Sequence, residues 1–143
     1  MDHVAILSKR LDLLGKILSG EKSVESRWYM HKRDPWNKVK EGDTVYFKES
    51  GSPVSAKAVV SKVLQFGDLD KDRVSGLLEE FSDGLGISEE RFSSLKERLK
   101  EKKRCILVFL ENPERIEPFN IDKTGFGLMS AWLCVDDITS LRI

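Results

Sequence analysis

The chain has 143 residues, and its 24 Lys and Arg balance its 24 Asp and Glu, so the formal net charge at pH 7 is zero. This balance excludes a strong field over the whole protein of the kind that attracts nucleic acid, so any basic surface has to be local. The longest apolar run, Cys105 to Leu110, is too short to cross a bilayer, and the acidic start at Asp2 is unlike a signal peptide. We therefore expect a cytoplasmic protein with no membrane partner.

The first thirty residues predict a strand, a helix and a second strand. Residues 3–7 are short and apolar, and Ser8 can cap a helix with leucines at helical spacing, which Gly20 ends. The next residues alternate in character, which is typical of a strand. Because side chains alternate across a strand, Glu25 and Arg27 share one face of it.

Residues 22–40 combine six basic side chains with only two acidic ones and several aromatic rings. Cations and flat rings together suit a surface that binds phosphates and unstacked bases. An ordinary solvated loop, with Trp36 folded back over the core, is the alternative, and the composition alone leaves both open.

The middle of the chain predicts a hairpin followed by helices. Residues 44–48 and 55–65 alternate on either side of a turn, and the second run is long enough to require a bulge. A helix capped by Asp70 and a second one capped by Ser88 follow, separated by two glycines. Acidic residues of the segment 68–90 could dock a basic protein partner. The cations that end the second helix suit its dipole and require no ligand.

The C-terminal third predicts the remaining strands. Residues 105–110 are continuously apolar, as in a strand that is covered on both faces, and extended pieces are expected at 116–121, 129–135 and 138–143. Trp28 and Trp132 suit a core better than a stacking surface. The two cysteines lie in apolar stretches without metal-ligand spacing, so we expect reduced thiols, no metal and no cofactor.

This order of elements, with a Gly-x-Lys-x-x-Glu-x-Arg second strand, resembles the ASCH family of the PUA-like superfamily. The matching residues are Gly20, Lys22, Glu25, Arg27, Gly42, Asp43, Ala131 and Trp132. The match runs through nearly the whole chain as one domain, residues 1–143, and is loosest in a helical insertion at roughly 68–103. The resemblance implies an α+β fold, a small PUA-like β-barrel of about six strands flanked by about three helices.

The resemblance also implies binding of RNA, or of a nucleotide-sized ligand, in relation to translation or RNA modification. The ligand would lie in a polar cleft around the second strand. Lys22 and Arg27 can hold phosphates or carbonyl edges, and Glu25 can accept from a base amino group. A structural ion pair between Glu25 and Arg27 is the simpler alternative. The complete set of expected ligand-binding residues is Lys22, Glu25, Arg27, Lys32, Arg33, Trp36 and Lys123.

An enzymatic alternative comes from small relatives of similar fold that remove an acyl group from modified cytidine. Their Lys-x-x-Thr motif supplies a Thr nucleophile, whereas Glu25 stands at that position here, so the resemblance to these amidohydrolases fails at its central residue. Lys22 and Glu25 remain catalytic candidates only through a carboxylate-activated water and a lysine-stabilised oxyanion. His3 and His31 are isolated and are expected to be structural or exposed. Binding is therefore favoured over catalysis, and a protein-interaction module without RNA is the third possibility.

Overall fold

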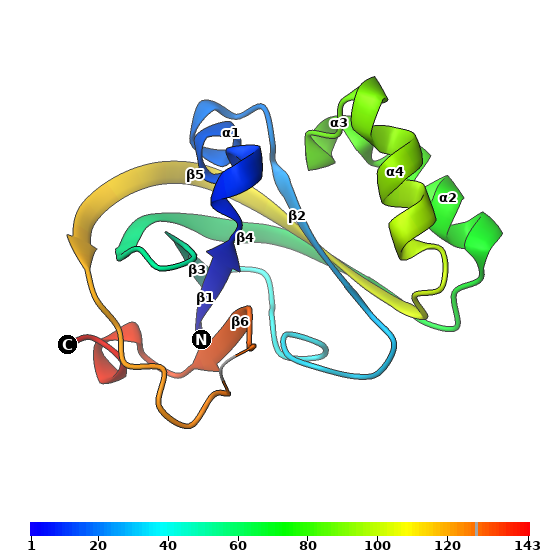
Figure 1. Ribbon diagram of the computed structural model, residues 1–143. Helices are drawn as coiled ribbons and strands as arrows, with labels where there is room; N and C mark the ends of the chain where they lie inside the picture. Colours follow the sequence, from blue (N-terminus) through cyan, green and yellow to red (C-terminus); the bar gives the residue numbers. More distant parts are fainter. Residues whose placement is uncertain (128) are drawn as a thin grey trace.

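The computed structural model describes residues 1–127 and 129–143. Its centre is a six-stranded sheet with the order β2-β5-β4-β3-β1-β6 (Figure 1). β1 and β3 are parallel, and the other neighbouring strands are antiparallel. The long β4 and β5 curl the sheet into a half-barrel, which confirms the expected α+β class and the barrel of six strands. The strands are β1 Asp2–Leu7, β2 Val24–Tyr29, β3 Thr44–Glu49, β4 Val54–Phe66, β5 Arg104–Phe119 and β6 Trp132–Val135.

Among the described residues, four α-helices flank the sheet where about three were expected. The additional helix is α3, a single turn that Gly86 ends with a φ of 69°. Helices α2, α3 and α4 gather on one side of β2 and β5, whereas α1 lies apart from them (Figure 1). The helices are α1 Leu13–Ser19, α2 Lys71–Glu80, α3 Ser82–Leu85 and α4 Glu89–Leu99, with 3-10 turns at Lys9–Leu11 and Ile138–Ser140.

The apolar run in β5 is covered on both faces, as its sequence predicts. Ile106 and Val108 point into the concave core with α1, β3 and β4. Cys105 and Leu107 pack instead against α2, α3 and α4. Burial of both faces ties the helical segment to the sheet, since each apolar side chain removed from water contributes about 1.5–3 kcal/mol.

Among the described residues, the pairing of β4 with β5 shifts register at three places. In β4, Val60 and Val63 belong to the same core although their numbers have opposite parity, and the pairing with β5 shifts between Val60 and Lys62. In β5, Asn112 adopts a φ of 53° and the strand continues beyond Pro113. The expected bulge in β4 is confirmed, and the separate extended piece at 116–121 proves to be mostly the end of β5.

Two of the expected elements are wrong. The first helix begins at Leu13, because Ser8 caps a 3-10 turn and Asp12, with a φ of 49°, interrupts the chain. Residues 138–143 form no strand but a 3-10 turn with a single bridge beyond it. There the Asp137 carboxylate accepts from the backbone N–H and the hydroxyl of Thr139, which favours a turn over an extended strand.

The remaining expectations concern single residues. Trp132 is 2% exposed and belongs to the core, as predicted, and Trp28 is half-buried and packs against the core cluster formed by β5 and the helices. Both cysteines are free thiols; Cys105 is buried and Cys134 is partly buried. No helix among the described residues is long and apolar enough to span a membrane.

Candidate functional site

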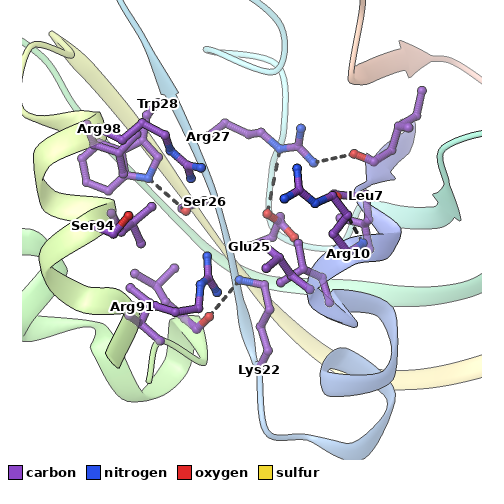
Figure 2. Close-up of a pocket in the computed structure, with 18 residues that line it drawn as sticks. Leu7, Arg10, Lys22, Glu25, Ser26, Arg27, Trp28, Arg91, Ser94 and Arg98 are labelled. Atoms are coloured by element: carbon purple, nitrogen blue, oxygen red, sulfur yellow. Dashed lines mark hydrogen bonds and ion pairs between the residues drawn. The ribbon is translucent and has the colours of Figure 1, made fainter. Parts of the chain in front are cut away.

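A cleft of about 490 Å³ lies along the edge strand β2, between the β1–α1 segment and helices α3 and α4 (Figure 2). Part of its lining is apolar and includes Leu7, Trp28 and Leu95. Five basic side chains and only one acidic side chain line it, so a chain of zero net charge carries a strongly positive cleft. The polar lining residues are Ser8, Arg10, Lys22, Glu25, Ser26, Arg27, Arg91, Ser94 and Arg98.

The start of β2 brings three of the expected ligand-binding residues into this cleft. Gly20 ends α1 with a φ of 86°, which lets the chain turn directly into the edge strand. Among the described strands, β2 pairs only with β5, so its other edge borders the cleft. Lys22, Glu25 and Arg27 all line it, with Glu25 between the other two (Figure 2).

Lys22 is 5% exposed and is held by main-chain carbonyls. Its Nζ donates to the carbonyl oxygens of Val24 at 2.8 Å and Leu85 at 3.0 Å. Burial lowers the pKa of Lys22, and the neighbouring Glu25 carboxylate opposes that shift. Because an ammonium group has three N–H donors, two carbonyl partners leave one donor for the cleft.

The glycines between α2 and α4 allow α3 to approach the cleft floor. The Ser23 N–H donates to the Gly84 carbonyl at 2.8 Å, and a Cβ on Gly84 would lie 2.8 Å from Val24 Cγ2. In the sequence this glycine reads only as a helix breaker. The structure shows that it is also a contact between α3 and β2 that leaves no room for a side chain.

Glu25 and Arg27 form an incomplete ion pair. Glu25 is 5% exposed, and its Oε1 lies 4.0 Å from Arg27 Nε, too far for a hydrogen bond. Within the described residues, Glu25 Oε2 and Arg27 Nε are buried and have no hydrogen-bond partner. Buried polar atoms without partners are costly and rare in proteins, so this pair is poorly explained as a structural salt bridge.

The rest of the Arg27 side chain bridges the opening of the half-barrel. Its Nη1 donates to the Ala131 carbonyl at 3.3 Å and its Nη2 to the Ile6 carbonyl at 3.4 Å. The guanidinium also lies 5.2 Å from the centre of the Trp132 ring. Arg27 thereby connects β2 to the β1–β6 side of the sheet, and these contacts hold its Nε beside Glu25.

Three further arginines surround the cleft. Arg91, Ser94 and Arg98 lie on one face of α4, at positions i, i+3 and i+7, and Arg10 approaches from the opposite wall (Figure 2). The described part of the chain contains no ion-pair or hydrogen-bond partner for any of these three guanidinium groups. Free guanidinium groups on both walls can hold an anion, and Arg binds phosphate oxygens in pairs.

Solved structures of similar shape identify the fold. An ASCH protein from Zymomonas mobilis matches with a TM-score of 0.69 and 18% sequence identity, over 99% of this chain and 96% of that chain. A Tyr-to-Phe variant of that protein matches with a TM-score of 0.69 and 17% identity, over 99% of both chains. The chain has the ASCH fold.

A third solved structure is less similar. This hypothetical protein matches the chain with a TM-score of 0.51 and 18% identity, over 81% of this chain and 100% of that chain. No model of a known protein family matches the sequence, and no curated protein does either. At these identities the likeness covers the fold alone, so the function has to be argued from the cleft.

Four of the expected ligand-binding residues lie outside the cleft lining of this ASCH fold. Lys32 and Arg33 are exposed in the loop after β2, where Arg33 lies 5.6 Å from the centre of the Tyr29 ring. Trp36 packs against the barrel core. Lys123 donates to the Ser130 carbonyl at 3.1 Å in a separate loop. Residues near β2 in the sequence are therefore not all near the cleft in space.

The sequence reasoning missed Arg10, Arg91 and Arg98. A signal for two of them was present, because Arg91, Ser94 and Arg98 repeat at the spacing of one helix face. The helix dipole, however, is a sufficient explanation for Arg98 in the last turn of α4, and Arg91, near the start of the helix, gives no signal on its own. Arg10 lies in the 3-10 turn that reads as the start of the first helix.

Proposed function

We propose that this ASCH-fold chain binds single-stranded RNA, or a nucleotide-sized fragment of it, in the cleft along β2. The observation that carries the proposal is a buried carboxylate oxygen, Glu25 Oε2, that has no partner among the described residues and lies in a cleft lined by basic side chains. The basic side chains can bind an anion such as phosphate. The Glu25 carboxylate needs a hydrogen-bond donor, and a phosphate group at neutral pH is a poor donor. A nucleotide supplies both, through its phosphate and its base.

The shape of the cleft favours an unpaired base. A volume of about 490 Å³ is in the range of small-ligand sites, and Trp28 and the leucines of the lining offer apolar surface to a base. A base inside a duplex could not reach a carboxylate that is 5% exposed, so the base has to be unstacked. The ASCH fold supports the further proposal that the RNA belongs to translation or RNA modification in the cytoplasm.

Fluorescence anisotropy with a labelled single-stranded RNA, measured at increasing salt, tests this proposal. We expect affinity to fall steeply with salt, and the double variant Arg91→Gln/Arg98→Gln to weaken binding. Each phosphate contact removed should reduce the slope of log K against log salt by about 0.7. The matched control is Lys32→Gln/Arg33→Gln, which removes two cations outside the cleft lining. A flat salt dependence, or a loss of affinity confined to the loop variant, contradicts binding in the cleft.

The amidohydrolase alternative has one supporting observation, the burial that lowers the pKa of Lys22 beside Glu25. Against it, the Lys22 ammonium already donates to two main-chain carbonyls. Incubation with N-acylated cytidines decides the matter: we expect no turnover. Turnover that disappears in both Lys22→Ala and Glu25→Gln would establish the enzyme instead.

A protein partner of the acidic segment 68–90 is a separate proposal. Within that segment, α2 presents exposed carboxylates, among them Glu79 and Glu80, to solvent. A basic protein captured on this face should stay bound after nuclease treatment and in the Lys22→Ala variant, because neither change touches α2.

A further inference from the structure

Three polar groups at the cleft floor have unmade hydrogen bonds among the described residues, in the order donor, acceptor, donor. Glu25 lies between Lys22 and Arg27 (Figure 2). Glu25 Oε2 is an acceptor without a partner, and Arg27 Nε is a donor without a partner among the described residues. Lys22 Nζ adds a donor, since its two carbonyl partners leave the third N–H unused.

These three groups are fixed before any ligand arrives. The Val24 and Leu85 carbonyls hold Lys22, and the Ala131 and Ile6 carbonyls hold Arg27. The partners are main-chain atoms of packed elements, so the donors cannot easily swing away to suit a different ligand. A preset pattern of this kind selects among ligands, because a mismatched polar group is left buried and unpaired.

We propose that the cleft reads uracil. The Watson–Crick edge of uracil presents an acceptor, a donor and an acceptor, namely O4, N3–H and O2, and is the complement of this floor. Glu25 Oε2 accepts the hydrogen bond from N3–H, and Lys22 Nζ and Arg27 Nε donate to the two carbonyl oxygens. The inference rests on the proposed binding of RNA and names the base that the site prefers.

The other three bases each leave a mismatch. In cytosine and adenine the ring nitrogen at the centre of this edge, N3 or N1, carries a lone pair and no hydrogen. It would therefore face the Glu25 carboxylate as a second acceptor, and no hydrogen bond could form. Guanine offers N1–H to Glu25, but its amino group then points a second donor at one of the flanking cations. Buried mismatches of this kind support a preference of about tenfold or more for uracil.

Affinity and base preference come from different parts of the cleft. Arg91 and Arg98 stand on α4, on the wall opposite Arg10, and suit phosphates, which every nucleotide carries (Figure 2). Phosphate contacts position a nucleic acid without reading its sequence. Removing these arginines should therefore weaken all nucleotides equally and leave the ratios between bases unchanged.

The test is displacement of a labelled short oligouridine from the full chain by nucleoside monophosphates. UMP should compete about tenfold or more better than CMP, AMP or GMP. The decisive pair is 3-methyl-UMP, in which a methyl group replaces the N3 hydrogen, and 5-methyl-UMP, which keeps the edge intact. We expect the first to lose about tenfold in affinity and the second to match UMP.

Two variants complete the design. Glu25→Gln preserves shape but replaces one carboxylate oxygen by an N–H donor, so the preference for UMP should shrink to about twofold. Arg91→Gln/Arg98→Gln should weaken all four monophosphates and keep their ratios. Equal competition by all four bases, a preference for another base, or equal binding of the two methylated nucleotides overturns the reading of uracil while RNA binding stands. Failure to bind any oligonucleotide at low salt overturns the proposed function itself.

Discussion

Two clusters of buried polar side chains contact Trp132, one through His3 and the other through Arg27, and they differ in whether their hydrogen bonds are made. In one cluster, His3 is fully buried, its Nε2 donates to Asp43 Oδ2 at 2.8 Å, and its Nδ1 accepts from Trp132 Nε1 at 3.1 Å. In the other, at the cleft floor, Glu25 Oε2 and Arg27 Nε have no partner among the described residues.

The difference separates structural polar residues from residues that await a ligand. A buried network that is fully satisfied stabilises one arrangement of the chain. A buried carboxylate with an unmade hydrogen bond costs stability, and such costs concentrate at functional sites. Of the residues that resemble the ASCH family, Asp43 and Trp132 therefore serve the fold, whereas Glu25 and Arg27 suit the proposed ligand.

The largest effect should come from breaking the satisfied cluster. His3→Ala leaves the Trp132 indole N–H without its partner, removes one of the hydrogen bonds to Asp43 and opens a cavity, so the free energy of unfolding should fall by about 3 kcal/mol. Urea denaturation measures it. The matched control is His31→Ala, an exposed histidine, with an expected change of less than about 0.5 kcal/mol. Equal losses of unfolding free energy in the two variants would contradict a structural role for His3.

The unsatisfied cluster should respond much less. Glu25→Gln removes a buried carboxylate with an unmade hydrogen bond but also the charge that favours the Lys22 ammonium, so the free energy of unfolding should change by less than about 1 kcal/mol. Affinity for oligouridine should fall about tenfold at the same time. Thermal melting and anisotropy on the same sample check both. Marked destabilisation by this variant would make Glu25 a structural residue like His3 and remove the contrast between the clusters.

Acid should weaken the satisfied cluster. Burial lowers the pKa of His3, and the hydrogen bond to Asp43 opposes that shift only in part. In the unfolded chain the same histidine binds a proton near pH 6.5, so below that pH the unfolded state holds more protons and stability falls with falling pH. The slope should approach about 1.4 kcal/mol per pH unit below pH 6.5.

Urea denaturation between pH 7.5 and pH 5 gives this slope, and His3→Gln should flatten it. Asp43 titrates in a different window. Burial alone would raise the pKa of Asp43, but hydrogen bonds from His3 and the Lys40 amide outweigh it, so the net shift is downward. Its contribution is lost only as the pH falls below about 3.8. An identical pH slope in His3→Gln and the natural chain would place the acid sensitivity elsewhere.

The sequence contains local information on both clusters. It does not show which residues that are distant in the sequence contact one another in the fold. Alternation along β2 is enough to place Glu25 and Arg27 on one face, and the apolar run of β5 predicts its burial on both faces. The isolation of His3 in the sequence suggests a structural residue, but its partners lie 40 and 129 residues away. Local patterns carry no information at that separation.

The same limit applies to the cleft walls. Arg91 and Arg98 border β2 because the helical segment packs on the sheet, which the close contact of Gly84 with Val24 allows, and this is a property of the folded chain. The two wrong predictions of secondary structure, at the start of α1 and at residues 138–143, have a local cause, since side chains there favour a turn. Asp12 ends the 3-10 turn before α1 can start, and the Asp137 side chain favours a turn where β propensity predicts a strand.

The smallest effect is expected from the basic loop, which composition alone would place in the binding surface. Lys32 and Arg33 are exposed and do not line the cleft, so Lys32→Gln/Arg33→Gln should change the affinity for oligouridine by about twofold or less at physiological salt, as expected from screening of solvated charges. Anisotropy at low and physiological salt measures the change beside that of Arg91→Gln/Arg98→Gln. Equal losses from the two pairs would mean that a longer RNA leaves the cleft and follows the loop. The binding surface would then include the residues that the sequence first indicated.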